Sequence, residues 1–192
     1  WVGGAIKKDR LFFFANIEHN NQDAVVTIQP NVPSFASLAQ NASQPYTGKQ
    51  LSVRFDYRVN ANHSLFMRYS HDGNRGFGPL GNNQLPSNWV KNTNWSDQSI
   101  LGVTSTLSSN LVNDLRFAYQ YWRNRNLFPD QTDCPGCIGL GLPQMSVVGS
   151  NVVFGNTSNA TQGRDLRKFT FTDNVTWQRG AHRIRMGGEI ER

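Results

Sequence analysis

The segment from Leu51 to Ser70, LSVRFDYRVNANHSLFMRYS, constrains the fold of this chain more than any other. Up to Val59 it alternates between apolar residues and polar or charged ones, which is the period of two typical of a strand with one apolar face. Asn60, Ala61, Asn62 and His63 form a short polar turn, and alternation resumes from Leu65. The segment therefore predicts an antiparallel β-hairpin.

Two environments suit such a hairpin. In a soluble sandwich the apolar face would pack on a second sheet, whereas in an outer-membrane barrel it would contact lipid and the charged face would line a hydrated lumen. No apolar run approaches the ~20 residues that a membrane-spanning helix needs. The mean hydropathy of −0.53 does not argue against a barrel, because only every second residue of a barrel strand faces lipid.

The pattern of connections favours the barrel. The end of one strand at 1–6 and seven further strands are predicted, separated by alternately short and long polar connections. Outer-membrane barrels place short turns on one side and long loops on the other, which a sandwich has no reason to do. The predicted fold is therefore all-β, with antiparallel up-and-down strands forming part of a transmembrane outer-membrane β-barrel. The predicted strands are 10–18, 51–59, 64–70, 95–107, 111–123, 166–178 and 183–192, and the long loops 19–48, 72–94 and 124–165.

Aromatic residues on the apolar faces support this interpretation. Tyr69, Trp95 and Tyr121 fall at the ends next to long loops, and Tyr57 and Trp177 fall near short turns. Two such girdles are expected where amphipathic rings meet the two membrane interfaces. One residue does not fit: Asp173 shares a face with Phe171 and Val175, so a bulge or a position near the interface is expected there.

Charge raises a different possibility. The net charge of +6 and a pI near 9.7 are compatible with nucleic-acid binding. The basic residues, however, alternate with acidic ones, as in Arg54-Phe55-Asp56, instead of forming a stripe. No recognition helix, zinc finger or RNA-binding sheet signature is present, so we expect no nucleic-acid partner.

Three segments resemble the barrel of TonB-dependent outer-membrane receptors, and most of all the Oar-like group, whose members often carry an N-terminal carboxypeptidase-regulatory-like domain. The segments are GGAIKKDRLFFFANIE, LSVRFDYRVNANHSLFMRYS and FTFTDNVTWQRGAHRIRMGGEIER. The most specific part is the combination of Gly3-Gly4, Lys7-Lys8-Asp9 and Phe12-Phe13-Phe14 with Trp177, Gly180, His182 and Gly187-Gly188.

The resemblance implies a barrel of about 22 strands in the bacterial outer membrane, closed by a plug domain and coupled to the TonB system through a segment near its N-terminus. Such a receptor takes up a ligand captured by its extracellular loops. Because the chain opens on Trp1 and stops at Arg192 inside an apparent strand, we expect residues 1–192 to be a fragment of that barrel, without plug or signal peptide.

The motif Cys134-Pro-Gly-Cys137 has three possible interpretations. A redox site would need a strand-to-helix setting, and a zinc site would need two further ligands nearby. Neither is in the local sequence, so a small structural disulfide in an oxidising compartment is predicted. The four histidines lie at turns or strand ends without a coherent Ser or Cys partner, and we expect no catalytic residues, no metal and no cofactor.

Two sets of side chains are candidates for ligand contact. The first is on the charged faces of the strands, where arginines could bind an anionic ligand or could be solvated wall residues paired with acids: Arg54, Arg58, Arg68 and Arg116. The second is Phe77 and Trp89, which could cradle a ligand at the mouth of the barrel. Two alternatives stay open, a structural or adhesive outer-membrane barrel without transport and a soluble all-β ligand-binding module such as a lectin-like sandwich.

Overall fold

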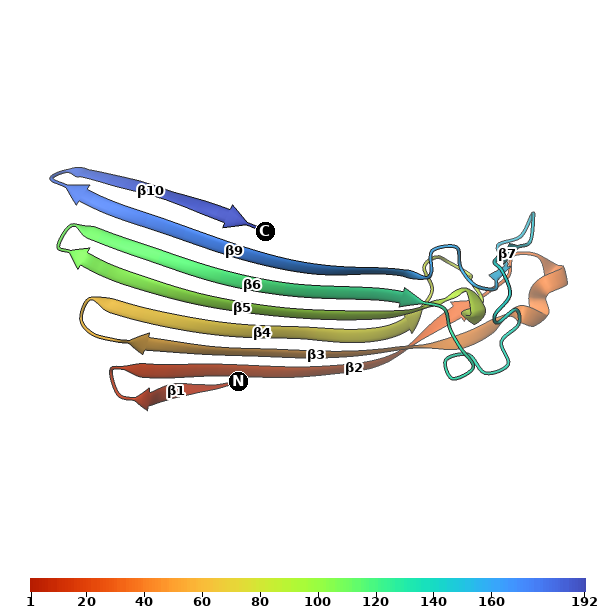
Figure 1. Cartoon of the computed structure of the whole chain (residues 1–192). Coiled ribbons are helices and arrows are strands. Elements are labelled where there is room, and N and C mark those ends of the chain that lie inside the picture. Colours follow the sequence, from red (N-terminus) through yellow and green to blue (C-terminus); the bar gives the residue numbers. More distant parts are fainter.

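The computed structural model describes residues 1–192 as a curved antiparallel sheet of eight strands, in which each strand pairs with the next of the sheet in chain order (Figure 1). The all-β up-and-down fold predicted from sequence is confirmed, and the partial strand at the N-terminus pairs like the rest. The strands are β1 (Val2–Lys7), β2 (Leu11–Ile28), β3 (Gln40–Arg58), β4 (His63–Gly78), β5 (Val90–Ser108), β6 (Leu111–Leu127), β9 (Gln162–Arg179) and β10 (His182–Glu191).

All four short turns lie at one end of the sheet and all three long connections at the other, as predicted (Figure 1). At the short-turn end, Asp9 and Gly180 adopt positive φ, the left-handed conformation that several types of tight turn between strands use. The long connections contain the 3-10 segments η1 (Pro33–Leu38) and η2 (Pro86–Asn88) and a small ladder of β7 (Met145–Ser146) with β8 (Val153–Phe154). No helix of the structure combines the length and apolar character needed to cross a membrane.

The register separates the side chains into two faces. One row across the sheet is apolar and consists of Phe13, Phe55, Met67, Leu101, Phe117 and Phe171. A neighbouring row of opposite orientation is polar and consists of Asn16, Ser52, Ser70, Gln98, Gln120 and Lys168. Since successive side chains of a strand point to opposite faces, every strand contributes to one mainly apolar face and one mainly polar face.

The strands are longer than the sequence predicted, and the predicted loop boundaries are wrong. Much of 19–48 and 72–94, and both ends of 124–165, belong to strands β2 to β6 and β9. These outer portions extend beyond the apolar rows and are mostly polar, apart from a few residues such as Ile28 and Phe77 that pack in the loops, so the alternation disappears. Their pairing is supported by side-chain hydrogen bonds across the strands, such as Thr47 Oγ1 to Asn21 Oδ1 at 3.0 Å and Thr27 Oγ1 to Asn41 Oδ1 at 2.9 Å.

No bulge interrupts the sheet at Asp173. The pairing of β9 is continuous through this residue, which lies opposite Leu115 on β6 and Gly188 on β10. Its carboxylate instead accepts a hydrogen bond from Asn113 Nδ2 on the same face. A local amide partner therefore replaces the backbone irregularity that the sequence suggested.

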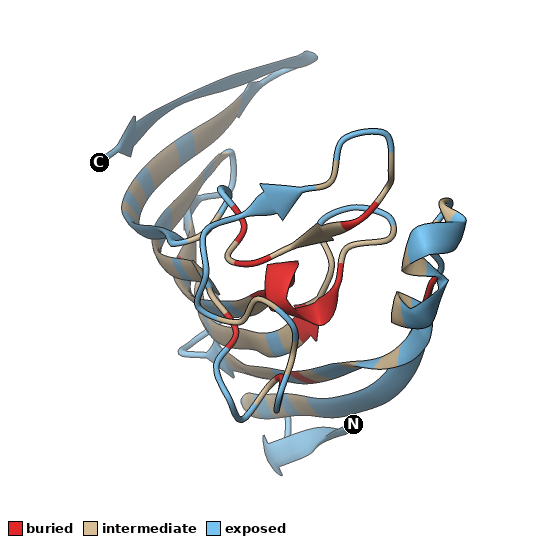
Figure 2. Cartoon of the chain, turned by 90° about the vertical axis from the view of Figure 1, so that its right-hand side faces the viewer, coloured by how far each residue is buried: buried red, intermediate tan, exposed pale blue.

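Buried residues are concentrated at the long-loop end. The apolar face of the sheet has no covering layer, and Ile190 on it is 71% exposed. At the other end the three long connections fold together inside the curve of the sheet, with the buried η2 segment at the centre (Figure 2). The resulting loop core contains Ile28, Phe77, Leu85, Trp89, Cys134 and Val152.

Candidate functional site

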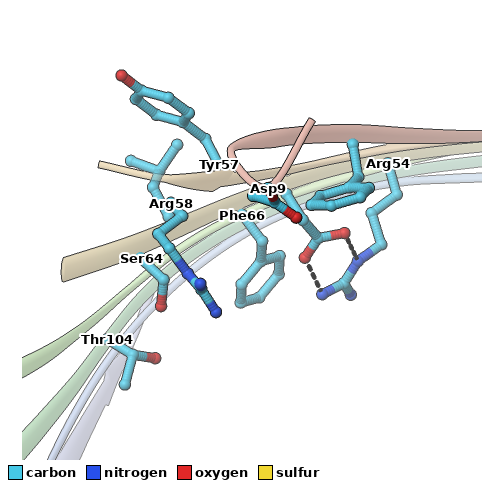
Figure 3. A pocket seen from close by; sticks show the side chains of 10 residues that line it. Asp9, Arg54, Tyr57, Arg58, Ser64, Phe66 and Thr104 are labelled. Carbon is cyan, nitrogen blue, oxygen red and sulfur yellow. Dashed lines mark hydrogen bonds and ion pairs between the residues drawn. The ribbon is translucent and has the colours of Figure 1, made fainter. Parts of the chain in front are cut away.

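A hollow of about 410 Å³ opens on the polar face near the short turns (Figure 3). Arg54 forms a two-point ion pair with Asp56, with Nε to Oδ2 at 2.7 Å and Nη2 to Oδ1 at 2.6 Å. The same guanidinium lies 4.6 Å from the centre of the Phe66 ring, a cation–π arrangement. Arg58 and Thr104 lie on the same side of the sheet as Phe66, while Tyr57 points to the opposite face (Figure 3).

The four arginines predicted to contact a ligand all lie on the polar face, but they are not equivalent. Arg54 and Arg116 are paired with carboxylates, Arg116 through Nε to Asp114 Oδ1 at 2.7 Å. Arg68 donates through Nη2 to Gln98 Oε1 at 3.2 Å. Arg58 has no carboxylate at ion-pairing distance. Arg58 and Arg68 therefore both carry a charge that no carboxylate compensates, whereas the guanidinium groups of Arg54 and Arg116 must first lose their carboxylates before they can bind an anion in the lumen.

Five asparagines form a continuous ladder farther out on the polar face. Asn94 Nδ2 donates to Asn74 Oδ1 at 3.0 Å and to Asn92 Oδ1 at 2.7 Å, and Asn124 Nδ2 donates to Asn94 Oδ1 at 2.7 Å. Asn92 Nδ2 also donates to Asn126 Oδ1. Each amide carries two donors and two acceptor lone pairs, so the ladder retains hydrogen-bonding capacity toward a polar molecule in the lumen.

Sequence reasoning missed this ladder because all five residues were assigned to loops. The signal that could have revealed it is the spacing of two in Asn92-Thr93-Asn94 and Asn124-Arg125-Asn126. This spacing places paired amides on one face only if the segments are strands.

The prediction that Phe77 and Trp89 cradle a ligand is wrong for this arrangement. Trp89 is 0% exposed and Phe77 is 9% exposed, and their ring centroids are 5.1 Å apart within the loop core. The indole Nε1 donates to the carbonyl oxygen of Gln84 at 2.8 Å. Both rings stabilise the fold of the loops, because large aromatic side chains bury more apolar surface than other residues and dominate the stability of a small core.

Hydrogen bonds join loops that are distant in sequence. Asn88 Nδ2 donates to the carbonyl oxygen of Gly155 at 2.8 Å, and Gly155 N donates to Ser87 Oγ at 3.0 Å. Asn31 and Asn151 exchange bonds, each backbone N–H donating to the other's Oδ1 at 2.9 and 3.0 Å. The loops therefore form one ordered structure at this end of the sheet.

Comparison with known proteins identifies the family. A model of the outer membrane beta-barrel domain matches residues 24–192. The chain belongs to this outer membrane beta-barrel family. Its structure is similar to that of the outer membrane transporter YddB from Escherichia coli, with a TM-score of 0.69, 11% sequence identity, and coverage of 98% of this chain and 24% of that one. The chain thus spans about a quarter of the length of that transporter. No curated protein matches this sequence.

Membership of the outer membrane beta-barrel family assigns an environment to each face and places the chain in the bacterial outer membrane. The apolar face is the lipid face, the polar face is the lumen face, and the long connections lie on the extracellular side. Tyr69, Trp95 and Tyr121 form the outer part of the lipid face, and Tyr57 and Trp177 lie beside the inner turns.

The extracellular loops of this outer membrane beta-barrel hold the two cysteines. Cys134 and Cys137 are joined in the structure, with their Cα atoms 5.5 Å apart, and Cys134 is buried in the loop core. The same loop is tied to the start of β5, because Lys91 Nζ lies 2.6 Å from Asp130 Oδ2 and 3.0 Å from Asp133 Oδ2.

The hydrogen bonds between Lys91 and Asp130 shift the pKa values of both groups. The bond from Lys91, with further bonds from Thr132, holds the pKa of Asp130 well below its usual range. The bond to Asp130 in turn raises the pKa of the Lys91 ammonium. Both groups therefore stay charged across the physiological pH range.

Proposed function

We propose that this chain is part of the wall and outer mouth of a TonB-dependent receptor of the Oar-like group, which takes up a ligand across the outer membrane. The observation that carries the proposal is the combination of a hydrogen-bonding lumen wall with a folded cap of extracellular loops over it. The motif resemblance described above and the structural similarity to an outer membrane transporter support it.

In this proposal the loops capture the ligand, and the ligand then passes along the lumen wall. The asparagine ladder and the hollow around Arg58 are the parts of the wall best supplied with unused polar groups. Energy would come from the TonB system through a segment of the receptor outside these residues. No catalytic step is assigned to the chain, and the protein is proposed to be a transporter and not an enzyme.

The test uses the intact receptor and the purified C-terminal domain of TonB as probe. The expected result is specific binding of this domain, abolished when the receptor segment preceding its plug domain is deleted. If the intact, folded receptor does not bind the TonB domain, energy-coupled uptake is contradicted. The alternative of a structural or adhesive barrel would then be the better description.

A further inference from the structure

A band of basic residues follows the outer aromatic residues on the lipid face. Moving outward along β3, Lys49 is the first lipid-face residue after Leu51, and along β6 Arg123 is the first after Tyr121. Along β9, Arg167 comes directly after Phe169 on the same face. Apolar, aromatic and then cationic positions therefore succeed one another on separate strands.

The centre of this band is a row across four adjacent strands. Lys49 pairs with Gly73, Gly73 with Trp95, and Trp95 with Arg123. Because Gly73 has no side chain, a hollow of about 600 Å³ opens beside it. Arg75, the next lipid-face residue outward on β4, also lines this space. We call the space lined by Lys49, Gly73, Arg75, Trp95 and Arg123 the outer cationic hollow.

The positive charge of the outer cationic hollow is offset only in part within the chain. Lys49, Arg75 and Arg123 are exposed, and none has a carboxylate at ion-pairing distance. The nearest carboxylates already have partners. Asp165 lies directly opposite Arg123 in the pairing of β6 with β9, but its ion pair is with Arg125, at 2.5 Å.

Asp97 is the second nearby carboxylate, and three side chains surround it. It accepts hydrogen bonds from Tyr69 Oη at 2.6 Å and from Trp95 Nε1 at 2.5 Å. Nδ1 of His71 lies 2.8 Å from its Oδ1. These bonds hold the Trp95 ring in place beside the hollow.

The position of the hollow decides which ligand it suits. Trp95 and Tyr121 belong to the aromatic girdle at the membrane interface, so cations beside them and farther outward are level with the lipid headgroups. These headgroups carry phosphate, which guanidinium groups bind through paired hydrogen bonds. The hollow lies on the face opposite the lumen, so a transported ligand does not pass it.

We propose that the outer cationic hollow binds the phosphorylated headgroup of an outer-leaflet lipid. Arg123 and Arg75 hold the phosphate oxygens, Lys49 contributes a third charge, and the face of Trp95 packs against the non-phosphate part of the headgroup. The site fixes a lipid to one strip of the barrel wall, from β3 to β6.

The test titrates the intact, detergent-purified barrel with bisphosphorylated lipid A and counts bound lipid by native mass spectrometry. Each surface cation is worth about a five-fold change in affinity for an anionic headgroup. Replacing Lys49, Arg75 and Arg123 together by glutamine is therefore expected to weaken binding on the order of 100-fold. Arg179→Gln, which removes a cation from the inner end of β9, is the matched control and should change nothing.

A second arm changes the shape of the site and not its charge. A Cβ at Gly73 would lie 2.9 Å from Nε2 of His71, the far end of a movable side chain, so Gly73→Leu is expected to fold while filling the hollow. It should weaken lipid A binding at least ten-fold. Retained heat-modifiable mobility in SDS gels reports that each variant is folded.

Two comparisons on the unaltered barrel need no variant. Monophosphorylated lipid A should bind more weakly than the bisphosphorylated form, and millimolar inorganic phosphate should not displace the lipid. Equal binding of the two lipids overturns the proposal, as does equal weakening by Arg179→Gln. Displacement by inorganic phosphate would assign the hollow to free phosphate and overturn the lipid assignment.

Discussion

Side chains that are neighbours in sequence on β3 face different solvents, and the effect of a substitution depends on which face it alters. Phe55 lies in the apolar row of the lipid face, whereas Ser52 lies in a polar row of the lumen face beside Ser70. Hydrocarbon cannot solvate a charge and the lumen can. The same new residue should therefore destabilise the barrel at Phe55 and be tolerated at Ser52.

Phe55→Arg in the intact protein is expected to destabilise the folded barrel by about 2–4 kcal/mol, the cost of a cation near the bilayer midplane. Ser52→Arg should fold to nearly the wild-type yield, because its guanidinium reaches water. The measurement is the amount of folded barrel in isolated outer membranes. Equal losses for the two variants would contradict the assignment of faces.

The Asn113–Asp173 pair permits a double-mutant cycle on the lipid face. Asn113→Leu leaves the Asp173 carboxylate without its amide donor, which is expected to cost about 1–3 kcal/mol. The double variant Asn113→Leu/Asp173→Val removes both polar groups and should recover most of this loss. Urea unfolding in lipid vesicles measures each value, and a double variant less stable than Asn113→Leu would show that the pair does not act as a unit.

For the elements, the sequence predicted the strands where one face meets lipid and failed farther out, where neither face does. Leu51 to Tyr57 and Leu115 to Tyr121 alternate because hydrocarbon selects every second residue. Asn20 to Ile28 and Asn92 to Trp95 carry no such pattern, although they pair in the same ladders. The loop core was missed for a related reason, since its buried residues come from the outer ends of β2 and β4 and from two separate connections, and only the fold brings them together.

Trp89→Ala tests whether the loops fold as one unit. The side chain is fully buried, so its removal should destabilise the loop core by about 3–5 kcal/mol, while the barrel strands stay paired. Limited proteolysis on whole cells should then cleave the loops at lower protease concentration. Leu80→Ala, at an exposed position of the same connection, is the control and should cleave as the wild type does.

The ion pair between Lys91 and Asp130 predicts that the stability of this loop depends on pH. Because the pKa of Asp130 is lowered on folding, its contribution is complete above the ordinary aspartate range, about pH 4, and is lost as pH falls through the lowered value. At neutral pH, hydrogen exchange of residues 128–137 should be slower in the wild-type protein than in the Lys91→Met variant. In strong acid the wild-type exchange rate should approach that of the variant. A difference that persists unchanged at pH 2 would contradict the tie.

At the scale of the whole molecule, the sheet buries almost nothing on its lipid face and leaves an unpaired edge on both β1 and β10. An apolar surface of this size and two open edges favour association in water. The isolated 192-residue chain is expected to aggregate in buffer and to disperse only in detergent, as judged by sedimentation velocity. A monodisperse monomer with a cooperative melt in buffer would instead support a soluble all-β module.

The length of the strands also sets where recognition takes place. A strand of 18 or 19 residues such as β2 or β3 rises about 45 Å when tilted by ~40°, against the ~25 Å height of the apolar band. Because the inner aromatic residues adjoin the short turns, the surplus of about 20 Å stands entirely outside the cell. The barrel wall therefore extends well above the membrane surface. An incoming molecule first meets the folded extracellular loops, which lie above the lipid headgroups. It then passes polar side chains of the lumen face before it reaches the level of the bilayer.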